Sequence, residues 1–411
     1  MGEKVNLLFD FVTLQTKTGA AEYVRTIFSS LLNEIKTHHY DNINIFALYN
    51  SSLGIAYEDF KEKHLSVQYT NIKYIDIYKQ DILSVITEYQ INRFFIGCAQ
   101  YLGNIPNIEN ISCETFCVVH DMVDEEIYDN NLNVFTELLN PSFKLTEKKH
   151  SILGFFKYHA KTSSFISFFR KTRKENWNRK SRTDFLQKQH KKNSHFHLIS
   201  VSDYSKQSIS FKCKIEADSI DVLYSPERIY QQSLSTNEKI KQLIKEKKFY
   251  LLLNANRSLK NPYNAINAFK TFAEAHQDCF LVTVGYSKKE FENHIDLPFL
   301  NDFDLMYLTK YCYALIYPSF FEGFGYPPIE AMKYGKPILA SNTTSLPEIL
   351  GNAPIYFSPL YATGIYKALL ELNDTNYERF SKKSCEQYAT IKKKTEQDQK
   401  TLLNYILNGK K

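Results

Sequence analysis

Two carboxylates flank a glycine-containing loop in the C-terminal half of the chain. The stretch "ALIYPSFFEGFGYPPIEAMKYGKPILAS", residues 314–341, places Glu322 before and Glu330 after "GFGYPP". Carboxylate oxygens accept hydrogen bonds and therefore suit a ligand with many hydroxyl groups, such as a sugar or a ribose. Two carboxylates about 5–9.5 Å apart could instead act as a hydrolase pair, and the spacing in the sequence leaves that alternative open.

The segments on either side of this loop predict a strand, a short helix and a second strand. "ALIY" and "PILA" are short apolar runs that are typical of buried strands. Pro327 and Pro328 suit the first turn of a helix, and Gly335 suits its end. A loop between a strand and a helix lies at the carboxyl end of the strand, where open α/β sheets bind their ligands. Glu322 and Glu330 are therefore expected at a ligand site.

Two cations follow another predicted strand. "LLLNANRSLKNPYNAINAF" places Arg257 and Lys260 between an apolar run and a helix that starts near residue 261. Cations at the carboxyl end of a strand suit a diphosphate leaving group, whose charge grows as its bond breaks. The alternative is a pair of solvated loop cations.

The N-terminal half offers two further candidates for ligand contact. His120 and Asp121 end the strand-like run "TFCVVHD", and they could face a ligand or form a structural pair. Gly19 precedes a predicted helix with apolar spacing at residues 23, 27, 31 and 35. A glycine there lets the backbone approach a ligand, although a simple tight turn would need it too.

Two serine motifs predict helix starts. "SLPEI" matches a capping box formed by Ser345 and Glu348. "VSDYS" places Ser202 and Ser205 at the beginning of a helix from residue 203. Both motifs are expected to be structural.

The alternation of strand-like and helical segments predicts an α/β protein with two doubly wound domains that enclose a cleft. At 411 residues, with 43% hydrophobic and 23% charged residues, the chain has the size and composition of a soluble two-domain protein. We predict an N-terminal domain over residues 1–225, a C-terminal domain over residues 226–385 and a tail over residues 386–411. The polar pattern over residues 375–408 is helical.

Composition also excludes several classes of protein. Seven cysteines without a CxxC pair predict neither a disulfide framework nor a zinc site, and no carboxylate pair has a metal-binding pattern. No apolar run reaches 18 residues, so no membrane-spanning helix is expected. The N-terminal run is too short and too poorly flanked for a signal peptide. We therefore expect a cytoplasmic protein without a bound metal or other cofactor.

One segment, residues 142–192, is strongly basic. It holds 15 Lys or Arg and three acids, a balance of +12, whereas the whole chain has +6 and the remainder therefore −6. Aromatic residues lie between these cations, namely Phe155, Phe156, Phe165, Phe168, Phe169 and Trp177. This combination fits peripheral contact with an anionic membrane surface. A solvated insertion remains an equal alternative, and no nucleic-acid-binding motif accompanies the segment.

The run "PSFFEGFGYPPIEAMKYGKPILASNTTSLPEILG" resembles the retaining glycosyltransferases of the GT-B fold, of the group 1 or family 4 type. The pattern of that family is EGFG-x-P-x-x-EA followed by G-x-P, with seven residues between its two glutamates, and Glu322 and Glu330 match it. The resemblance is specific over this run and looser over the rest of the C-terminal half. In the N-terminal half it rests on the order of strands and helices and on a few landmarks. It implies two Rossmann-like domains that face a cleft.

The resemblance implies roles for the residues of the C-terminal half. Glu322 would accept hydrogen bonds from the transferred sugar, and Glu330 would bind the ribose of the donor. Arg257 and Lys260 would hold the donor phosphates, although the family often spaces these two cations further apart. The same resemblance implies donor contacts for four consecutive residues of the glycine loop, namely Gly323, Phe324, Gly325 and Tyr326.

The resemblance also gives roles to the N-terminal half. His120 would contact the donor sugar, and Gly19 would lie near the donor phosphate and the acceptor. Many family members follow this glycine with an arginine where the present chain has Glu22, so the chain departs from the family pattern there. The tail helix would cross back to the N-terminal domain.

The activity implied is transfer of a hexosyl unit from a nucleoside-diphosphate sugar to a glycan or lipid-linked saccharide, with retained configuration and without a metal. The departing phosphate would take the acceptor's proton. The setting would be assembly of bacterial surface polysaccharide, such as lipopolysaccharide, on the inner face of the membrane. The rival is a non-catalytic GT-B partner or scaffolding subunit, which loss of Glu322 or of the cation pair would have favoured.

Overall fold

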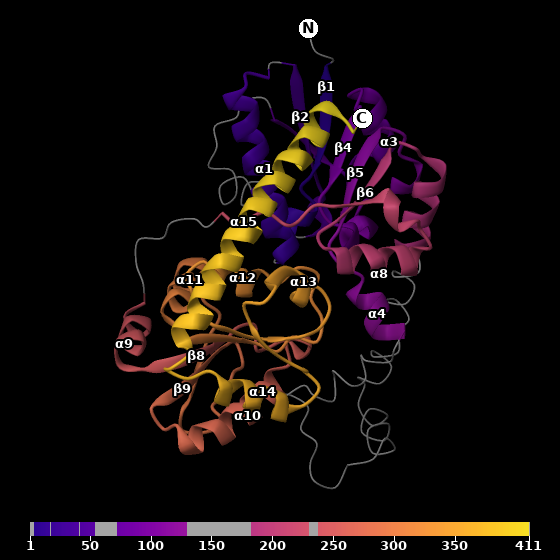
Figure 1. Ribbon diagram of the computed structural model, residues 1–411. Helices are drawn as coiled ribbons and strands as arrows, with labels where there is room; N and C mark the ends of the chain where they lie inside the picture. The colour runs from indigo at the N-terminus through magenta and orange to yellow at the C-terminus, as the bar shows by residue number, and fades with distance from the viewer. Residues whose placement is uncertain are drawn as a thin grey trace, which may run out of the picture. The chain divides into compact units, whose positions relative to one another are not determined.

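The computed structural model describes two compact units of the chain (Figure 1). The N-terminal unit comprises Met1–Met122, Phe156–Ile229 and Lys394–Lys411, and the C-terminal unit comprises Val123–Phe155 and Tyr230–Lys393. The described residues are 4–16, 18–40, 42–53, 72–129, 182–229 and 237–410. Most of the predicted basic segment, residues 142–181, therefore lies outside them, and its last part forms a helix over residues 182–192.

The N-terminal unit contains a parallel sheet of seven strands in the order β3-β2-β1-β4-β5-β6-β7. The strands are β1 (Val5–Asp10), β2 (Ile43–Tyr49), β3 (Ile72–Asp76), β4 (Arg93–Ile96), β5 (Glu114–Val119), β6 (Phe196–Ser200) and β7 (Ile220–Val222). Strands of such a sheet are covered on both faces, which explains why β1 is a continuous run of buried residues.

Helices cover this sheet, and their apolar faces supply much of its core. They are α1 (Gly19–Thr37), α3 (Ile82–Glu88) and α8 (Asp203–Cys213), while α4 (Val123–Asp129) begins the C-terminal unit. The predicted spacing along α1 is confirmed, because Tyr23, Ile27, Leu31 and Ile35 are all buried. The predicted cap of α8 is also confirmed, since the Ser202 side chain accepts a hydrogen bond from Ser205 N.

The C-terminal unit contains a second parallel sheet, of order β10-β9-β8-β11-β12-β13. Its strands are β8 (Lys248–Leu252), β9 (Cys279–Val284), β10 (His294–Leu297), β11 (Ala314–Tyr317), β12 (Ile338–Ser341) and β13 (Ile355–Phe357). Its helices are α9 (Glu238–Glu246), α10 (Pro262–Ala275), α11 (Asp302–Tyr311), α12 (Tyr326–Met332), α13 (Leu346–Leu350) and α14 (Ala362–Glu371). Helices α10 and α14 pack together on one face, and α11 and α12 lie on the other (Figure 1).

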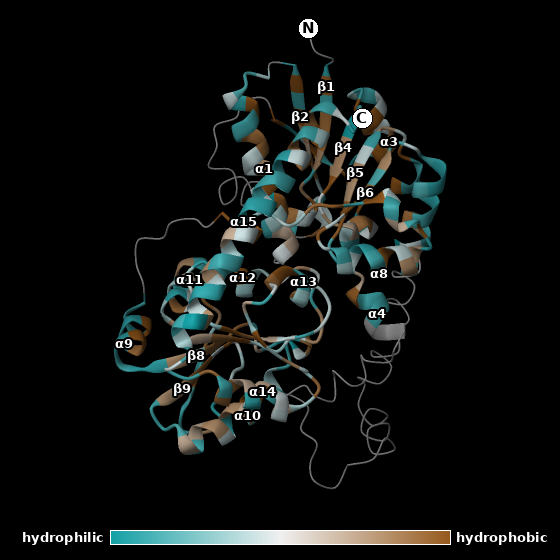
Figure 2. Cartoon of the chain, in the orientation of Figure 1, coloured by the Kyte–Doolittle hydropathy of each residue, from teal (hydrophilic) through white to brown (hydrophobic). Residues whose placement is uncertain are grey.

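Both units are doubly wound, Rossmann-like α/β domains, and the predicted fold class is confirmed. In each sheet the strand order reverses beside the first strand, between β1 and β4 and between β8 and β11. Loops that leave the two strands at such a point diverge to opposite faces and open a place for a ligand. The strands are mostly hydrophobic in Figure 2, as expected for sheets that helices cover.

One long helix, α15 (Tyr377–Asn408), belongs to both units. Its residues up to Lys393 belong to the C-terminal unit, and those from Lys394 belong to the N-terminal unit. Within the N-terminal unit, Asp398 accepts a hydrogen bond from Tyr224 N at 2.8 Å, and Gln399 donates one to Ser30 at 2.7 Å. None of the helices in the described ranges is long and apolar enough to cross a bilayer.

Candidate active site

Lys260 and Glu322 meet at the carboxyl edge of the C-terminal sheet. Lys260 ends a short 3-10 turn between β8 and α10, and Glu322 lies in the loop between β11 and α12. Because β8 and β11 are neighbouring parallel strands, these loops start next to each other at the edge of the sheet. Lys260 Nζ forms an ion pair with Glu322 Oε1 and donates to the Tyr317 hydroxyl at 3.3 Å. Each side chain of the ion pair is only 11% exposed, so the two charges are held in a largely desolvated place.

Arg257 lies apart from this pair. The sequence groups it with Lys260, but the residue is exposed, and its side chain makes no hydrogen bond or ion pair with the part of the chain that the structure describes. The two cations therefore differ in state: Lys260 is buried and neutralised by Glu322, and the side chain of Arg257 stands in solvent.

The glycine loop has the tight backbone that its sequence predicts. Gly325 adopts φ +90° at the start of α12, and a Cβ there would lie 2.9 Å from Leu346 Cδ2. Gly323 and Phe324 are buried, and the Phe324 ring lies 5.6 Å from the ring of Tyr326, which opens α12. Glu330 is half-buried in the same helix. Glycine is strongly favoured at Gly325, because other residues would be strained at this backbone angle and a Cβ would overlap Leu346.

Two residues of the β12–α13 loop hold the main chain of Glu322. Its N–H donates to Thr344 Oγ1 at 3.1 Å, and its carbonyl accepts from Ser345 Oγ at 2.9 Å. The predicted capping box of Ser345 and Glu348 is thus wrong. Ser345 has helical angles, φ −75° and ψ −12°, whereas a capping residue is extended, so its hydroxyl turns to Glu322 and makes no cap.

Asn261 joins three loops at this edge, and the sequence did not mark it as a site residue. Its Nδ2 donates to the carbonyl of Pro318 at 3.2 Å and to that of Pro359 at 2.7 Å. The residue is buried and has a left-handed backbone, with φ 53°. Asparagine tolerates that conformation better than most residues. An asparagine directly before the proline of a helix start was the available signal.

His120 and Asp121, in the N-terminal unit, have different partners. His120 Nε2 lies 3.0 Å from the carbonyl of Gly97, and burial lowers the pKa of the imidazole to about 4. Asp121 instead accepts from Gln100 Nε2, at 2.9 Å on its carbonyl and 3.3 Å on its carboxylate. The main chain of Gly97, and not the neighbouring carboxylate, therefore holds the neutral imidazole, which argues against the structural pair that the sequence left as an alternative.

Gly19 begins α1, and a cation from a distant segment lies close to it. A Cβ at Gly19 would lie 3.7 Å from Nη2 of Arg228, which follows β7. Glu22, where the family pattern led us to expect an arginine, forms an ion pair with Arg25 at 2.5 Å. The sequence did not indicate Arg228, because 209 positions separate it from Gly19 (228 minus 19).

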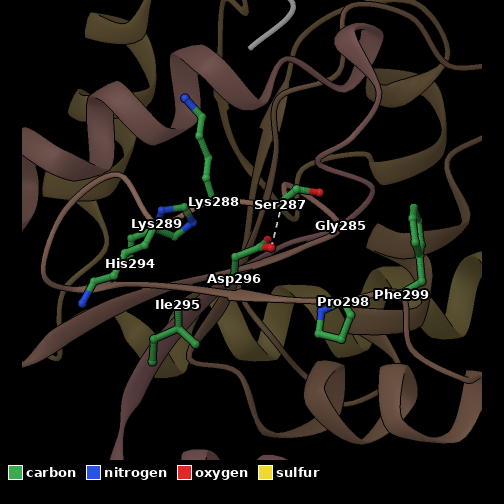
Figure 3. Close-up of a pocket in the computed structure, with 9 residues that line it drawn as sticks. All are labelled: Gly285, Ser287, Lys288, Lys289, His294, Ile295, Asp296, Pro298 and Phe299. Carbon is green, nitrogen blue, oxygen red and sulfur yellow. Dashed lines mark hydrogen bonds between the residues drawn. The ribbon is translucent and has the colours of Figure 1, made fainter. Parts of the chain in front are cut away.

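A pocket of about 660 Å³ lies along β10 (Figure 3). It is lined by Gly285, Ser287, Lys288, Lys289, His294, Ile295, Asp296, Pro298 and Phe299, and none of the predicted site residues is among them. Gly285 follows β9 and Phe299 follows β10, so this end of the pocket lies at the same edge of the sheet as Lys260. The Phe299 ring is 71% exposed and comes within 3.3 Å of the position that a Cβ of Gly285 would occupy.

Asp296 shapes the loop beside that pocket. Its carboxylate accepts from the backbone N–H of Tyr286 at 2.9 Å and of Ser287 at 2.8 Å, and the second contact is drawn in Figure 3. Thr283 Oγ1 donates to the same carboxylate at 2.6 Å. Over the ranges described, no group of three His, Cys, Asp or Glu side chains is arranged to hold a metal ion.

Part of the C-terminal unit matches a known protein family. Residues 235–359 match the family described as "Glycosyl transferases group 1". The O-antigen chain mannosyltransferase RfbU of Salmonella typhimurium is 29% identical over 175 residues, which is 40% of this chain and 47% of that protein. The O-antigen chain mannosyltransferase B of Escherichia coli is 40% identical over 86 residues, 21% of this chain and 23% of the relative. The chain thus spans less than half the length of these relatives.

Solved structures resemble the whole chain. The glycosyltransferase WaaG, involved in lipopolysaccharide biosynthesis, has a TM-score of 0.57 at 12% identity, over 98% of this chain and 100% of WaaG. Anabaena Alr3699/HepE, solved with UDP and glucose, has a TM-score of 0.58 at 14% identity, over 99% and 100%. Sucrose-phosphate synthase of Thermosynechococcus elongatus has a TM-score of 0.60 at 10% identity, over 98% and 97%. At these identities the likeness concerns the fold.

Proposed function

We propose that this group 1 glycosyltransferase of the GT-B fold transfers a hexosyl unit from a nucleoside-diphosphate sugar to a saccharide hydroxyl. The observation that carries this proposal is the ion pair of Lys260 and Glu322 at the carboxyl ends of β8 and β11. In such a pair the largely buried carboxylate can bind the sugar of the donor, and the neighbouring ammonium group can bind its diphosphate. The relatives named as O-antigen chain mannosyltransferases make mannose the first sugar to test.

Glu322 supplies acceptors for the hydroxyl groups of the sugar. The carboxylate has more lone-pair sites than the single contact with Lys260 uses. Thr344 and Ser345 fix its main chain, so the side chain starts from a set position. The backbone N–H groups after Gly323 lie in the same loop, and Glu330 on α12 supplies acceptors for a ribose.

Lys260 supplies charge for the leaving diphosphate. An ammonium group has three N–H donors, and Glu322 and Tyr317 take two of them. The third can bind a phosphate oxygen while the ion pair stays intact. Arg257 adds an exposed cation on the same loop, and its side chain can close on the phosphates without breaking any contact of the described residues.

We propose that the reaction retains the anomeric configuration, as the resemblance to the family implies. The bond between the anomeric carbon and the phosphate oxygen breaks, and its electron pair leaves with the diphosphate. The acceptor oxygen bonds to the same face of the anomeric carbon, and its proton passes to a phosphate oxygen. Lys260 and Arg257 neutralise the negative charge that develops on the diphosphate. They therefore stabilise the transition state more strongly than the bound ground state.

The end of the pocket at Gly285 and Phe299 suits the base of the nucleotide. An exposed aromatic ring is a stacking surface for any nucleobase. Gly285 has no side chain to crowd that ring, and its φ of +85° suits a glycine. Phe299→Ala is therefore expected to weaken binding of the nucleotide and to leave the fold intact, because the ring is largely in solvent.

We also propose that the basic segment, residues 142–192, holds the protein at an anionic membrane, where a lipid-linked acceptor would reside. Its charge of +12 supports this, since each Lys or Arg near such a surface contributes about 1 kcal/mol. Replacing the lysines and arginines between Arg170 and Arg182 with serine is expected to reduce binding to anionic liposomes. Equal binding of both proteins at low salt would rule the segment out as a membrane anchor.

The donor is tested first by thermal shift against GDP-, UDP-, dTDP- and ADP-sugars, because a ligand that binds the folded state raises its melting temperature. The donor that binds is then incubated with saccharide acceptors, and NMR of the product gives its anomeric configuration. A retained configuration supports the proposal, and an inverted one overturns the reaction course. Binding without transfer to any acceptor would favour the scaffolding subunit instead.

A further inference from the structure

The carboxyl ends of β1 and β4 are joined by a buried carboxylate. Asp10, the last residue of β1, is 1% exposed. Its Oδ2 accepts from the backbone N–H of Gly97, directly after β4, at 3.1 Å. Thr13 donates to the same carboxylate from its backbone N–H at 3.0 Å and from its hydroxyl at 2.5 Å. Three donors thus hold Asp10, and Asp10 in turn holds the main chain at Gly97.

The other polar group of Gly97 fixes His120, which follows β5. The Gly97 carbonyl lies 3.0 Å from His120 Nε2. A carbonyl can only accept, so Nε2 carries the proton, and the neutral ring keeps its lone pair on Nδ1. The depressed pKa of His120, about 4, agrees with a neutral ring at neutral pH. Nδ1 makes no hydrogen bond within the described chain, and the residue is only half-buried, so a ligand can reach it.

Neighbouring groups leave the ring little freedom. Tyr23 meets it edge-on, with 4.8 Å between ring centroids and 90° between their planes. Ser205 Oγ donates to the His120 carbonyl at 3.0 Å. Gly97 itself has no room for a side chain, because a Cβ there would lie 2.1 Å from Val24 Cγ2. Helix α1 therefore packs on both members of the Gly97–His120 contact.

We propose that Asp10 and Gly97 are positioning residues that hold His120 with Nδ1 directed to accept a hydrogen bond from a saccharide hydroxyl. The proposal rests on the function proposed above, in which His120 contacts a sugar, and it adds the residues that fix the tautomer and direction of the ring. A hydroxyl brings a proton to the Nδ1 lone pair. A phosphate oxygen at neutral pH brings none, and two acceptors facing each other repel. His120 thus selects the sugar part of a substrate and not its diphosphate.

The first experiment reads the tautomer directly and needs no substrate. Long-range proton–nitrogen NMR spectra of protein labelled with ¹⁵N-histidine, assigned with His120→Gln, are recorded near neutral pH. The expected result is the neutral tautomer protonated at Nε2. A ring protonated at Nδ1, or a rapidly exchanging mixture of tautomers, would overturn the proposal.

Asp10→Asn tests the positioning role. An amide cannot accept from all three donors, so the Gly97 main chain loosens and the two tautomers are expected to mix. Turnover is expected to fall about tenfold through misplacement of the ring, with the affinity for the nucleoside diphosphate unchanged. Asp76→Asn is the matched control, because Asp76 is also a buried carboxylate at a strand end and also accepts from nearby backbone N–H groups. It has no contact with Gly97 or His120, and it is expected to leave the tautomer and turnover as they were.

A wild-type spectrum in Asp10→Asn would show that Asp10 does not position the ring. If Asp10→Asn fails to fold, Thr13→Val takes its place, since it removes only the hydroxyl donor to Asp10. A smaller shift toward mixed tautomers is then expected. An unchanged tautomer in Thr13→Val would contradict the proposal.

Titration with ligands tests the hydroxyl. The Nδ1 resonance is expected to move on addition of the nucleotide sugar or the saccharide acceptor, and to stay in place with the nucleoside diphosphate alone. Movement of the resonance with the nucleoside diphosphate alone would remove the assigned role. A resonance that stays in place with every sugar ligand that binds would remove it too. If no nucleotide sugar or saccharide binds in the thermal-shift assay, the proposed function fails, while the tautomer and its dependence on Asp10 are still decided by the first two measurements.

Discussion

Lys260 and Glu322 stand 62 positions apart in the sequence and form an ion pair in which neither side chain is more than 11% exposed. The two buried charges neutralise each other before a ligand arrives. The pair also fixes both side chains in advance, which lowers the entropy that binding a donor must overcome. Glu322, proposed to bind the sugar, and Lys260, proposed to bind the phosphates, are thus held in place by each other.

Removing one partner of this pair leaves the other as an unpaired, mostly buried charge. Lys260→Met and Glu322→Leu are therefore each expected to lower the free energy of unfolding by about 1–3 kcal/mol. The double variant is expected to regain most of that loss, because no charge remains unpaired. Urea denaturation measures all three. A double variant that loses the sum of the two single losses would show that the pair is not coupled.

Glu322→Ala and Glu330→Ala are expected to fail in different ways. Glu322→Ala should abolish transfer and leave nucleotide binding largely intact, because its carboxylate is assigned to the sugar. Glu330→Ala should weaken binding of the nucleotide itself. Calorimetric titration with the nucleoside diphosphate, alongside turnover, separates the two. Substantial turnover in Glu322→Ala would end the assignment of this loop.

Arg257→Ala and Lys260→Ala are each expected to lower turnover a hundredfold or more, because losing a charge-assisted contact to a developing anion costs about 2.7–4 kcal/mol. Arg257→Ala should do so without loss of stability, since its side chain is in solvent. EDTA is expected to leave wild-type turnover unchanged. Activity that vanishes with EDTA and returns with a divalent ion would show that a metal meets the charge of the leaving group.

Gly325→Ala is expected to destabilise the C-terminal unit by about 1–3 kcal/mol, because the new methyl group would overlap Leu346 and the backbone angle would be strained. Gly103→Ala is the control, since a Cβ there would meet no heavy atom within 4 Å. Thermal unfolding compares the two. Equal melting temperatures would mean that the glycine loop adjusts freely.

His120 is expected to make the protein less stable in acid. Its pKa lies near 4 in the folded chain and near 6.5 when unfolded, so between these values the unfolded chain binds a proton that the folded one does not. The free energy of unfolding therefore falls as the pH drops from 6.5 to 4, by up to ~1.4 kcal/mol for each pH unit. His120→Gln should flatten this part of the stability profile, and His39→Gln, at an exposed residue, should not. An unchanged slope in His120→Gln would contradict the assignment.

Much of the fold could be predicted because buried parallel strands have short, apolar sequences. "ALIY" is β11, "PILA" overlaps β12 with an offset of one residue, and Pro327 and Pro328 lie in the first turn of α12. Such signals are local. They depend on which residues a strand or a first turn tolerates, and not on the partner across the sheet.

The contacts between the site residues could not be predicted, because they depend on which strands are neighbours in the sheet. The sequence grouped Lys260 with Arg257 because they are three positions apart, yet the contact of Lys260 is set by β8 lying beside β11. Asp10 and Gly97 were missed for the same reason, since their roles follow from the order β1-β4-β5. Ser345 was misread because its motif is local while its hydrogen bond is not. The roles of the site residues remain predictions for the experiments above.

The shared helix α15 has a consequence for engineering. The N-terminal unit needs the last residues of the chain, where Arg93 donates to the Leu407 carbonyl and Lys410 forms an ion pair with Asp221 at 2.6 Å. The segment Tyr230–Lys393, which holds the second sheet, is therefore inserted between two parts of the N-terminal unit. A chimera that exchanges this segment between relatives must be spliced at two junctions, near residue 230 and near residue 393, with the terminal segment kept from the recipient. A fusion with one junction would graft a foreign helix end onto the recipient's first sheet.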